Sequence, residues 1–345
     1  MGLNIKEIIP RKEIKLSDLK GKVLCIDAYN ILYQFLSSIR QIDGTPLMDE
    51  KQRVTSHLSG ILYRNVALLS EGIKLAYVFD GKSPELKSKT YKKREKGRDV
   101  AKGKYEQAKQ VEDITAMKRY SSQLIRLNDE MINESKELLK ALGIAVIQAP
   151  SEGEAEAAYL ARKKEVFAAV SQDYDSLLFG APKLIRNLTL ARKRKTISGY
   201  VEVYPELIEL KHVLDYLGIN LDQLICLGIL VGTDYNPRGI FRIGQKKALE
   251  IVKKYKQPVL IFKHVEELIK NLPEKDQFDW KEIFELFHKH NVKDAEIEFG
   301  KIDENKIREI LIKRHGFSEK RVEKQIERLR DIKEKQKQKG LDKWF

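Results

Sequence analysis

The sequence predicts an α/β fold with a mostly parallel central sheet flanked by helices. Short apolar runs alternate with stretches of helical periodicity as far as about residue 204, the pattern of a sheet covered on both faces. After Pro205 the periodicity becomes helical and stays so, which predicts a helical C-terminal region. The 345 residues can bury one large core, and we assign residues 1–330 to a single domain and residues 331–345 to a flexible tail.

Each predicted strand is a short apolar run. In chain order the runs are 23–26, 75–79, 144–147 and 167–170, followed by two further candidates at 183–188 and 200–204. Helices are predicted between them, including one that opens at Ser151. Cys25, inside the first run, is expected to pack in the core. The chain has one other cysteine, Cys226, and two cysteines cannot form a disulfide framework or a zinc site.

The segment 82–128 interrupts this pattern. It is polar, dense in Lys and Arg, and too poor in large aliphatic residues to cover a core face. Gly97 and Gly103 disfavour one continuous helix there, because glycine costs about 1 kcal/mol relative to alanine in a helix interior. A charge run is usually a solvated helix face, but this length and sign favour an electrostatic guide for a single nucleic-acid strand. The candidate contacts are Lys87, Lys92, Lys93 and Arg94.

The overall charge indicates the kind of partner. A formal charge of +14 and a pI near 9.4 favour nucleic acid. We find no apolar run long enough to span a membrane, and the N-terminus lacks the apolar run of a signal peptide, so we expect an intracellular protein without a membrane partner.

Seven acidic residues are placed at or after the ends of apolar runs. They are Asp27, Asp80, Glu152, Glu154, Asp173, Asp175 and Asp234. In an open α/β sheet the ligand crevice lies at the carboxyl ends of the strands. Carboxylates gathered there repel one another unless cations lie among them, so the pattern predicts an oxygen-ligand site for Mg²⁺ or Mn²⁺.

Two of these acid pairs have a spacing that suits metal binding. Asp173 and Asp175, like Glu152 and Glu154, stand at i and i+2. In extended backbone each pair projects to one side, with Cα atoms roughly 6–7 Å apart. Two ions held in this way about 4 Å apart can activate a water and stabilise the leaving oxygen in phosphodiester hydrolysis.

Each acid also has an ordinary structural interpretation. Ser151 and Glu154 match a helix capping box. Asp234 could be a turn aspartate, and Asp27 and Asp80 could each cap the element that follows. One such explanation is plausible for one residue, but it is poor for all seven together.

The segment Gly239–Ala248 looks like the turn of a helix-hairpin-helix. Glycines such as Gly239 and Gly244 let the backbone turn tightly, and the next helix then presents its amides to phosphate, with Lys246 and Lys247 close by. Gln245 stands where a P-loop requires lysine, so we predict no nucleoside-triphosphate site. A second basic run, 192–195, favours an exposed loop or a phosphate contact.

Taken together, these motifs resemble one family over essentially the whole chain, the flap endonucleases. The matching segments occur in the family's order: 27–29, 78–82, 149–155, 171–175 and 232–235, followed by the hairpin turn. The resemblance implies a helical arch over the active site at about 82–128 and a helix-hairpin-helix at about 221–256. It also implies an archaeal type, hence a cytoplasmic protein working at the chromosome, or a nuclear one if the source is eukaryotic.

The same resemblance implies roles for individual residues. Glu152, Glu154, Asp173 and Asp80 would hold one Mg²⁺ ion, Asp175 and Asp234 mainly a second, and Asp27 would support the pair, with Mn²⁺ able to substitute. Lys87 and Arg94 fall at arch positions that reach the scissile phosphate. Tyr33 matches a residue on which a base stacks, the alternative being an ordinary core tyrosine. Gly2 would lie near the active site, and the hairpin from Gly239 to Lys247 would grip duplex DNA with a K⁺ ion.

The last residues resemble the motif by which proteins dock on the replication sliding clamp (PCNA). The motif residues would be Gln338, Leu341, Trp344 and Phe345. The last three fall at i, i+3 and i+4, so one helical turn places them on a single face that suits a groove on a partner. The alternative is that the aromatic residues fold back onto the body.

The sequence therefore predicts a monomeric, metal-dependent nuclease that cuts a phosphodiester at the base of a 5′ flap in branched DNA. One alternative is a 5′–3′ exonuclease or a gap or junction endonuclease of the same family, which would share the site. Another is a DNA-binding scaffold without catalysis, recruited to the clamp. The complete acidic set argues against the scaffold.

Overall fold

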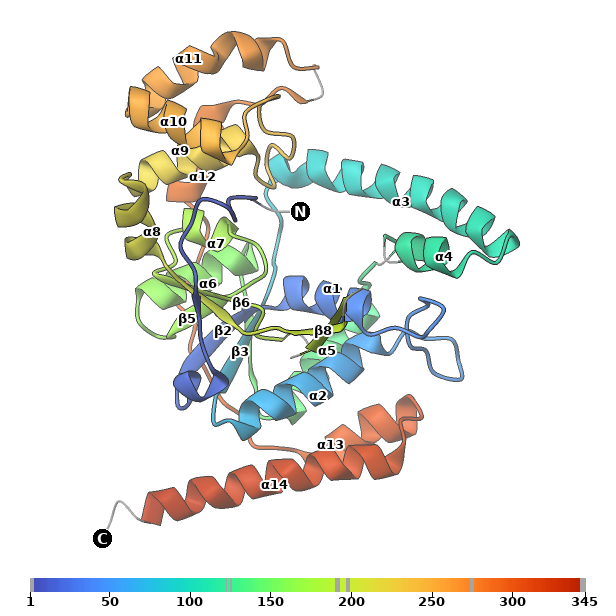
Figure 1. Ribbon diagram of the computed structural model, residues 1–345. Helices are drawn as coiled ribbons and strands as arrows, with labels where there is room; N and C mark the ends of the chain where they lie inside the picture. The colour runs from blue at the N-terminus through green and yellow to red at the C-terminus, as the bar shows by residue number, and fades with distance from the viewer. Residues whose placement is uncertain are drawn as a thin grey trace.

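The computed structural model describes residues 3–121, 123–124, 126–189, 193–196, 199–273 and 276–341. A seven-stranded sheet has the strand order β1-β9-β6-β5-β2-β3-β4. Figure 1 shows its central strands β5, β2 and β3 among the helices. The strands are β1 (Lys12–Glu13), β2 (Val23–Asp27), β3 (Lys74–Phe79), β4 (Ala145–Gln148), β5 (Ala168–Val170), β6 (Lys183–Arg186) and β9 (Glu206–Glu209). Strands β6 to β4 pair in parallel, whereas β9 and β1 are antiparallel at one edge, so the mostly parallel sheet is confirmed.

Two strand predictions need correction. The helical pattern does not begin at Pro205, because residues 206–209 form β9 and pair with β6. The candidate at 200–204 lies outside the main sheet: β8 (Gly199–Glu202) pairs with β7 (Lys193–Thr196) in a separate two-stranded sheet. Neither β9 nor β8 is a continuous apolar run, so the hydrophobic pattern of the sequence does not predict them well.

Helices cover both faces of the main sheet. On one side, α6 (Gly153–Arg162), α7 (Asp175–Leu178), α8 (Leu210–Leu217) and α9 (Leu221–Val231) form a core with the sheet, and α10 (Gln245–Tyr255), α11 (Pro258–Lys270) and α12 (Trp280–His288) pack on α9. On the other side lie the 3₁₀ turn η1 (Leu16–Leu19), α1 (Ala28–Ser38), α2 (Ser56–Ser70) and α5 (Asp129–Ala141). An outer layer follows there, formed by α13 (Glu304–Arg308), the π-helical turn η4 (Glu309–Arg314) and α14 (Glu319–Leu341).

The central strands feed both hydrophobic cores in alternation. Leu24 and Ile26 of β2 enter the core on the α1 side, whereas Cys25 between them enters the core on the α6 side. Each of the three is fully buried, which confirms Cys25 as a packing residue. The uninterrupted apolar run at residues 23–26 is thus explained by a sheet that has helices on both faces.

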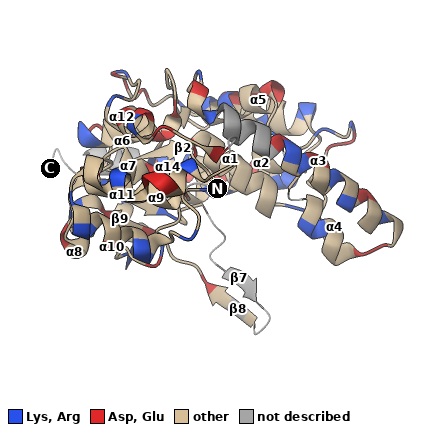
Figure 2. Cartoon of the chain, turned by 90° about the horizontal axis from the view of Figure 1, so that it is seen from above, with Lys and Arg blue, Asp and Glu red and all other residues tan. Residues whose placement is uncertain are grey.

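The basic segment projects from this body. The short 3₁₀ turn η2 (Glu85–Lys87) leads into α3 (Ser88–Gln110), and α4 (Ile114–Ser121) returns beside it; Figures 1 and 2 show the pair extending away from the sheet, with Lys and Arg along it. The expectation that Gly97 and Gly103 disfavour one continuous helix is wrong. Both stand in open space within α3, so neither interrupts it.

The C-terminal helix is longer than expected. Residues 331–341, assigned to the tail, continue α14, whose buried residues Val322, Ile326 and Leu329 pack on the α2 side of the sheet. Of the described helices, none alone is long and apolar enough to cross a membrane. The helices α8 and α9 reach that length and composition only when taken together, and they are bent by 82° to each other.

Candidate active site

The predicted carboxylates converge at one edge of the central sheet. Asp27 is the last residue of β2, and Asp80 directly follows β3. Glu152 lies between β4 and α6, and Asp173 follows β5. Because β5, β2, β3 and β4 are adjacent and parallel, their carboxyl ends meet there.

Three more carboxylates come from helix ends beside that edge. Glu154 stands in the first turn of α6, Asp175 is the first residue of α7, and Asp234 follows α9. After burial, the charge of Asp234 is the largest influence that raises the pKa of Asp175, and the ammonium of Lys87 contacts both Asp234 and Glu152. All seven predicted acids therefore belong to one cluster.

The capping-box interpretation of Ser151 and Glu154 is wrong. The residue before α6 is Glu152, and the Ser151 hydroxyl donates instead to the carbonyl of Lys82 at 3.1 Å. Glu154 Oε1 accepts a hydrogen bond from the Ser171 hydroxyl at 2.6 Å, across the sheet edge. Glu154 is thus directed into the acid cluster and not back along its own helix.

Asn30 is a residue of the site that the sequence analysis missed. Its side-chain Nδ2 donates to Asp173 Oδ2 at 3.0 Å, and its backbone amide donates to Asp27 Oδ1 at 3.2 Å. Its Oδ1 accepts from the Gln172 amide at 3.0 Å. Asp27 is therefore both the N-cap of α1 and a member of the cluster. The available signal was the position of Asn30, three residues beyond an acidic N-cap.

Backbone amides fix two more carboxylates. Gly153 N, at the start of α6, donates to Asp80 Oδ1 at 2.7 Å, and a Cβ at this glycine would approach that oxygen to 2.9 Å. Leu3 N donates to Asp175 Oδ1 at 3.1 Å, so the start of the described chain reaches the site. Gly2, predicted near the site, lies outside the described residues.

Burial and mutual repulsion act together on these acids. Burial raises the pKa of Asp27, Glu154 and Asp175 well above the ordinary range, and neighbouring carboxylates raise it further. Burial also raises the pKa of Asp80 and of Glu152, although the charge of Lys87 opposes the change. Added positive charge among these acids would therefore favour their ionised forms.

Lys87 brings positive charge into the cluster from the base of α3. Its Nζ pairs with Glu152 Oε1 and lies 3.6 Å from Asp234 Oδ2. Burial alone would lower the pKa of this ammonium group, but Glu152, Asp234 and Asp80 raise it above its ordinary value. One residue of the basic segment 82–128 is thus in direct contact with the acids.

The donor set fits hydrated Mg²⁺ in its chemistry. Within the described ranges, no three His, Cys, Asp or Glu side chains gather tightly enough to hold an ion among them. The donors are nevertheless all carboxylate oxygens, several are buried, and Lys87 offsets their charge only in part. Mg²⁺ keeps several waters in its shell, so its carboxylate ligands need not converge directly.

The predicted duplex-binding hairpin lies between α9 and α10. Gly239 has φ of +55°, and a Cβ there would overlap the carbonyl oxygen of Val231, so the turn requires glycine. Gly244 is the N-cap of α10, and Lys246 and Lys247 follow exposed on its first turn. The segment expected to form the hairpin thus connects two helices, α9 and α10.

The other residues predicted to contact DNA or the clamp are described only in part by the structure. Tyr33, on α1, is 38% exposed and is not the buried core tyrosine of the alternative interpretation. The backbone of Lys92, Lys93 and Arg94 lies on α3, and that of Gln338 and Leu341 on α14. Their side chains, like the whole of Arg192, Trp344 and Phe345, lie outside the described part of the chain.

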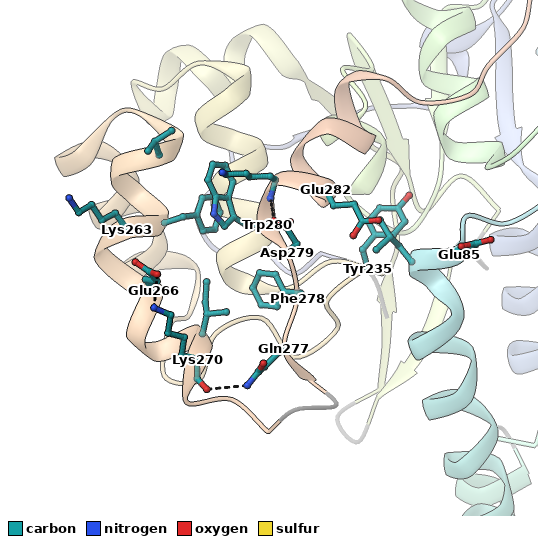
Figure 3. A pocket seen from close by; sticks show the side chains of 15 residues that line it. Glu85, Tyr235, Lys263, Glu266, Lys270, Gln277, Phe278, Asp279, Trp280 and Glu282 are labelled. Atoms are coloured by element: carbon teal, nitrogen blue, oxygen red, sulfur yellow. Dashed lines mark hydrogen bonds and ion pairs between the residues drawn. The ribbon is translucent and has the colours of Figure 1, made fainter.

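A cleft of about 980 Å³ adjoins the acid cluster without containing it. It runs between the base of α3 and helices α11 and α12 (Figure 3). Glu85 and Tyr235 stand at one end, and Phe278 and Trp280 lie along its wall. None of the seven acids lines it, so the cleft and the acid cluster are separate features.

The comparisons with known proteins agree on one group of relatives. The XPG N-terminal domain matches residues 4–101 and the XPG I-region matches residues 143–234, and these two ranges contain all seven acids. Flap endonuclease 1 of Staphylothermus marinus is 49% identical over 356 residues, with 100% of both chains covered.

Solved structures show the same relationship. Flap endonuclease-1 from Methanococcus jannaschii superposes with a TM-score of 0.75 at 38% identity, covering 96% of this chain and 98% of that one. The catalytic core of Rad2, solved in complex with a DNA substrate, gives a TM-score of 0.67 at 22% identity over 92% of this chain and 96% of that one. The second likeness concerns the fold alone.

Proposed function

The chain belongs to the flap endonuclease family, and we propose that its seven clustered carboxylates form the catalytic centre of this structure-specific flap endonuclease. Nucleases of this family depend on divalent metal ions. The observation that carries the assignment is the convergence of seven acids, several of them buried, at and beside the carboxyl ends of four adjacent parallel strands, with Lys87 among them. We take residues 1–330 as one nuclease domain, since both cores share one sheet.

The acids would hold two Mg²⁺ ions, for which Mn²⁺ can substitute. Asp80, Glu152, Glu154 and Asp173 would surround one ion, Asp175 and Asp234 mainly the other, and Asp27 would support both. Such ions, when bound, activate a water and stabilise the leaving oxygen of a phosphodiester. The protein's own contribution is to hold the acids in place, through Asn30 for Asp27 and Asp173 and through the Gly153 amide for Asp80.

The basic segment 82–128 would act as an arch for the 5′ end of the flap. Lys87 already lies beside the acids, where an ammonium group can stabilise negative charge that develops on the scissile phosphate. Arg94 follows on α3 and would reach the same phosphate, while Lys92 and Lys93 would contact the strand beside it. The substrate is branched DNA, selected by shape and by a free 5′ end.

Two further elements would hold the duplex. The hairpin between Gly239 and Lys247 would grip the phosphate backbone, with amides of α10 and a K⁺ ion at the turn. Comparing duplex binding in K⁺ and Na⁺ buffers tests the ion. The half-exposed ring of Tyr33 would stack on a base beside the cut, which Tyr33→Leu tests through the position of the cut.

The C-terminal residues would recruit the protein to the replication sliding clamp. The residues that would enter its groove are Gln338, Leu341, Trp344 and Phe345, at and beyond the end of α14. This contact is separate from catalysis, so it would raise the local concentration of the enzyme at replication sites without altering the chemistry.

The direct test is cleavage of an end-labelled 5′-flap duplex with Mg²⁺ and with EDTA. We expect a Mg²⁺-dependent cut at the junction. Stepwise trimming of nicked or blunt duplexes, in preference to the flap, would instead favour the 5′–3′ exonuclease. Cleavage that persists in EDTA would contradict the metal-dependent mechanism.

A further inference from the structure

Tyr235 lies directly behind the acid cluster and holds one of its members. Its side chain is buried, at 4% exposure, and its hydroxyl donates a hydrogen bond to Glu152 Oε2. The second oxygen of the same carboxylate, Oε1, pairs with the ammonium of Lys87. Glu152 is thus gripped on one side by the loop after α9 and on the other by the base of α3.

The ring of Tyr235 is itself fixed by its neighbours. It packs edge-on against Phe287 of α12, with centroids 5.4 Å apart and an interplanar angle of 74°. The ammonium of Lys87 lies 5.8 Å from its centroid. Its backbone amide donates to the Thr233 hydroxyl at 3.2 Å, within the turn that leads into the hairpin. The direction of the hydroxyl is therefore set by the fold.

We propose that Tyr235 is a positioning residue that orients the Glu152 carboxylate toward the metal ion and prevents its complete capture by Lys87. The inference rests on the assignment of Glu152 to a metal ion under the proposed function. Without the hydroxyl, Oε2 loses its donor and Lys87 becomes the dominant partner of the carboxylate. Hydrogen-bond donors behind a metal ligand typically contribute 10- to 100-fold in metal affinity or activity.

The same contacts connect the hairpin to the reactive centre. Tyr235 immediately follows Asp234, and the turn that contains it is closed by Asn236, whose Oδ1 accepts from the Thr233 amide at 3.0 Å. The Tyr235 hydroxyl is therefore carried by the same turn that leads into the hairpin.

The test compares Tyr235→Phe with Tyr77→Phe. Tyr77 is a matched control, because it is fully buried in the sheet and its hydroxyl donates to Asn65 Oδ1 at 2.8 Å, away from the acids. The probe is Mn²⁺ binding to the DNA-free protein, measured by electron paramagnetic resonance, with thermal melting in EDTA as the measure of folding. We expect Y235F to bind Mn²⁺ about 10- to 100-fold more weakly and Y77F to bind it as the wild type does.

Cleavage gives a second readout. Y235F should require more Mg²⁺ for half-maximal cutting, and the rate should recover at least in part at high Mg²⁺. Wild-type Mn²⁺ affinity in Y235F, with a melting loss like that of Y77F, would overturn the proposal. Glu152→Gln separates this failure from that of the proposed function: if E152Q loses Mn²⁺ and Y235F does not, the role of Tyr235 fails. If E152Q also binds Mn²⁺ normally, the metal assignment of Glu152 fails.

Discussion

Asn30 Nδ2 donates to Asp173 Oδ2 at 3.0 Å, so a residue in the first turn of α1 fixes a carboxylate that follows β5. The backbone amide of Asn30 independently holds Asp27. Two neighbouring strand ends are therefore linked by one residue, through its carboxamide and its backbone amide, and that residue is not itself a predicted metal ligand.

Asn30→Ala should separate these two contacts. The variant keeps the backbone amide that donates to Asp27 but removes the side-chain donor that Asn30 provides to Asp173. We expect single-turnover cleavage of a 5′ flap to fall about 10- to 100-fold at fixed Mg²⁺, with melting changed little. Cutting at the wild-type rate would show that Asp173 needs no support from Asn30.

Lys87→Ala should slow the chemical step. The ammonium lies between Glu152 and Asp234, and its loss removes a cation from the place where charge develops on the phosphate. We expect a loss of about 10²- to 10³-fold in single-turnover rate with flap binding in Ca²⁺ nearly unchanged. Lys270→Ala, an exposed lysine paired with Glu266, is the control and should cut normally. If K87A loses binding and not rate, Lys87 serves only to attract DNA.

Removal of residues 336–345 should leave cutting of free DNA within about two-fold of the wild type. The truncation preserves the part of α14 that packs through Val322, Ile326 and Leu329, so the variant should still fold. Stimulation of cleavage by the sliding clamp should disappear in the same assay. Stimulation that survives the truncation would place the clamp contact elsewhere on the chain.

Asp49 should stabilise the fold near neutral pH and lose that contribution in acid. Burial would raise its pKa, but hydrogen bonds from the amide and guanidinium of Arg53 and from His315 hold it at about 2, against 3.8 for the free group. The contribution, up to about 2 kcal/mol, is complete above pH 3.8 and is lost as the pH falls through 2. Asp49→Asn should therefore lower the melting temperature at pH 6 and converge with the wild type near pH 2. A constant difference across that range would contradict the assignment.

Most of the architecture could be predicted from the sequence, but few of the contacts that position the site residues could be. Apolar runs located β2, β3 and β5 because a strand buried on both faces has no polar positions to obscure it. Strand β9 was missed because Glu206 and Glu209 make it look like a polar turn at a sheet edge. The glycines of α3 were misjudged because propensity is a small term that a long helix tolerates.

The candidate site divides in the same way. Asp27 and Asp80 were predictable, because each stands at the carboxyl end of a buried strand. Carboxylates gathered there repel one another unless a cation lies among them. The capping interpretation of Glu154 failed because a local sequence pattern cannot reveal Ser171, which follows β5 and donates a hydrogen bond to Glu154. Asn30 and Tyr235 were missed for a related reason: an asparagine early in a helix and a tyrosine in a turn are ordinary, and their contacts exist only after the sheet has assembled.

The most direct test of the account is cleavage and binding of one 5′-flap substrate by Asp175→Ala and Asp80→Ala. Both acids belong to the cluster, and the seven acids act as a unit, so each loss should abolish nearly all Mg²⁺-dependent cutting and the double variant should add little. Flap binding in Ca²⁺ should persist in both. Substantial cutting by either variant, or loss of flap binding together with loss of folding, would contradict the claim that these carboxylates are the catalytic centre.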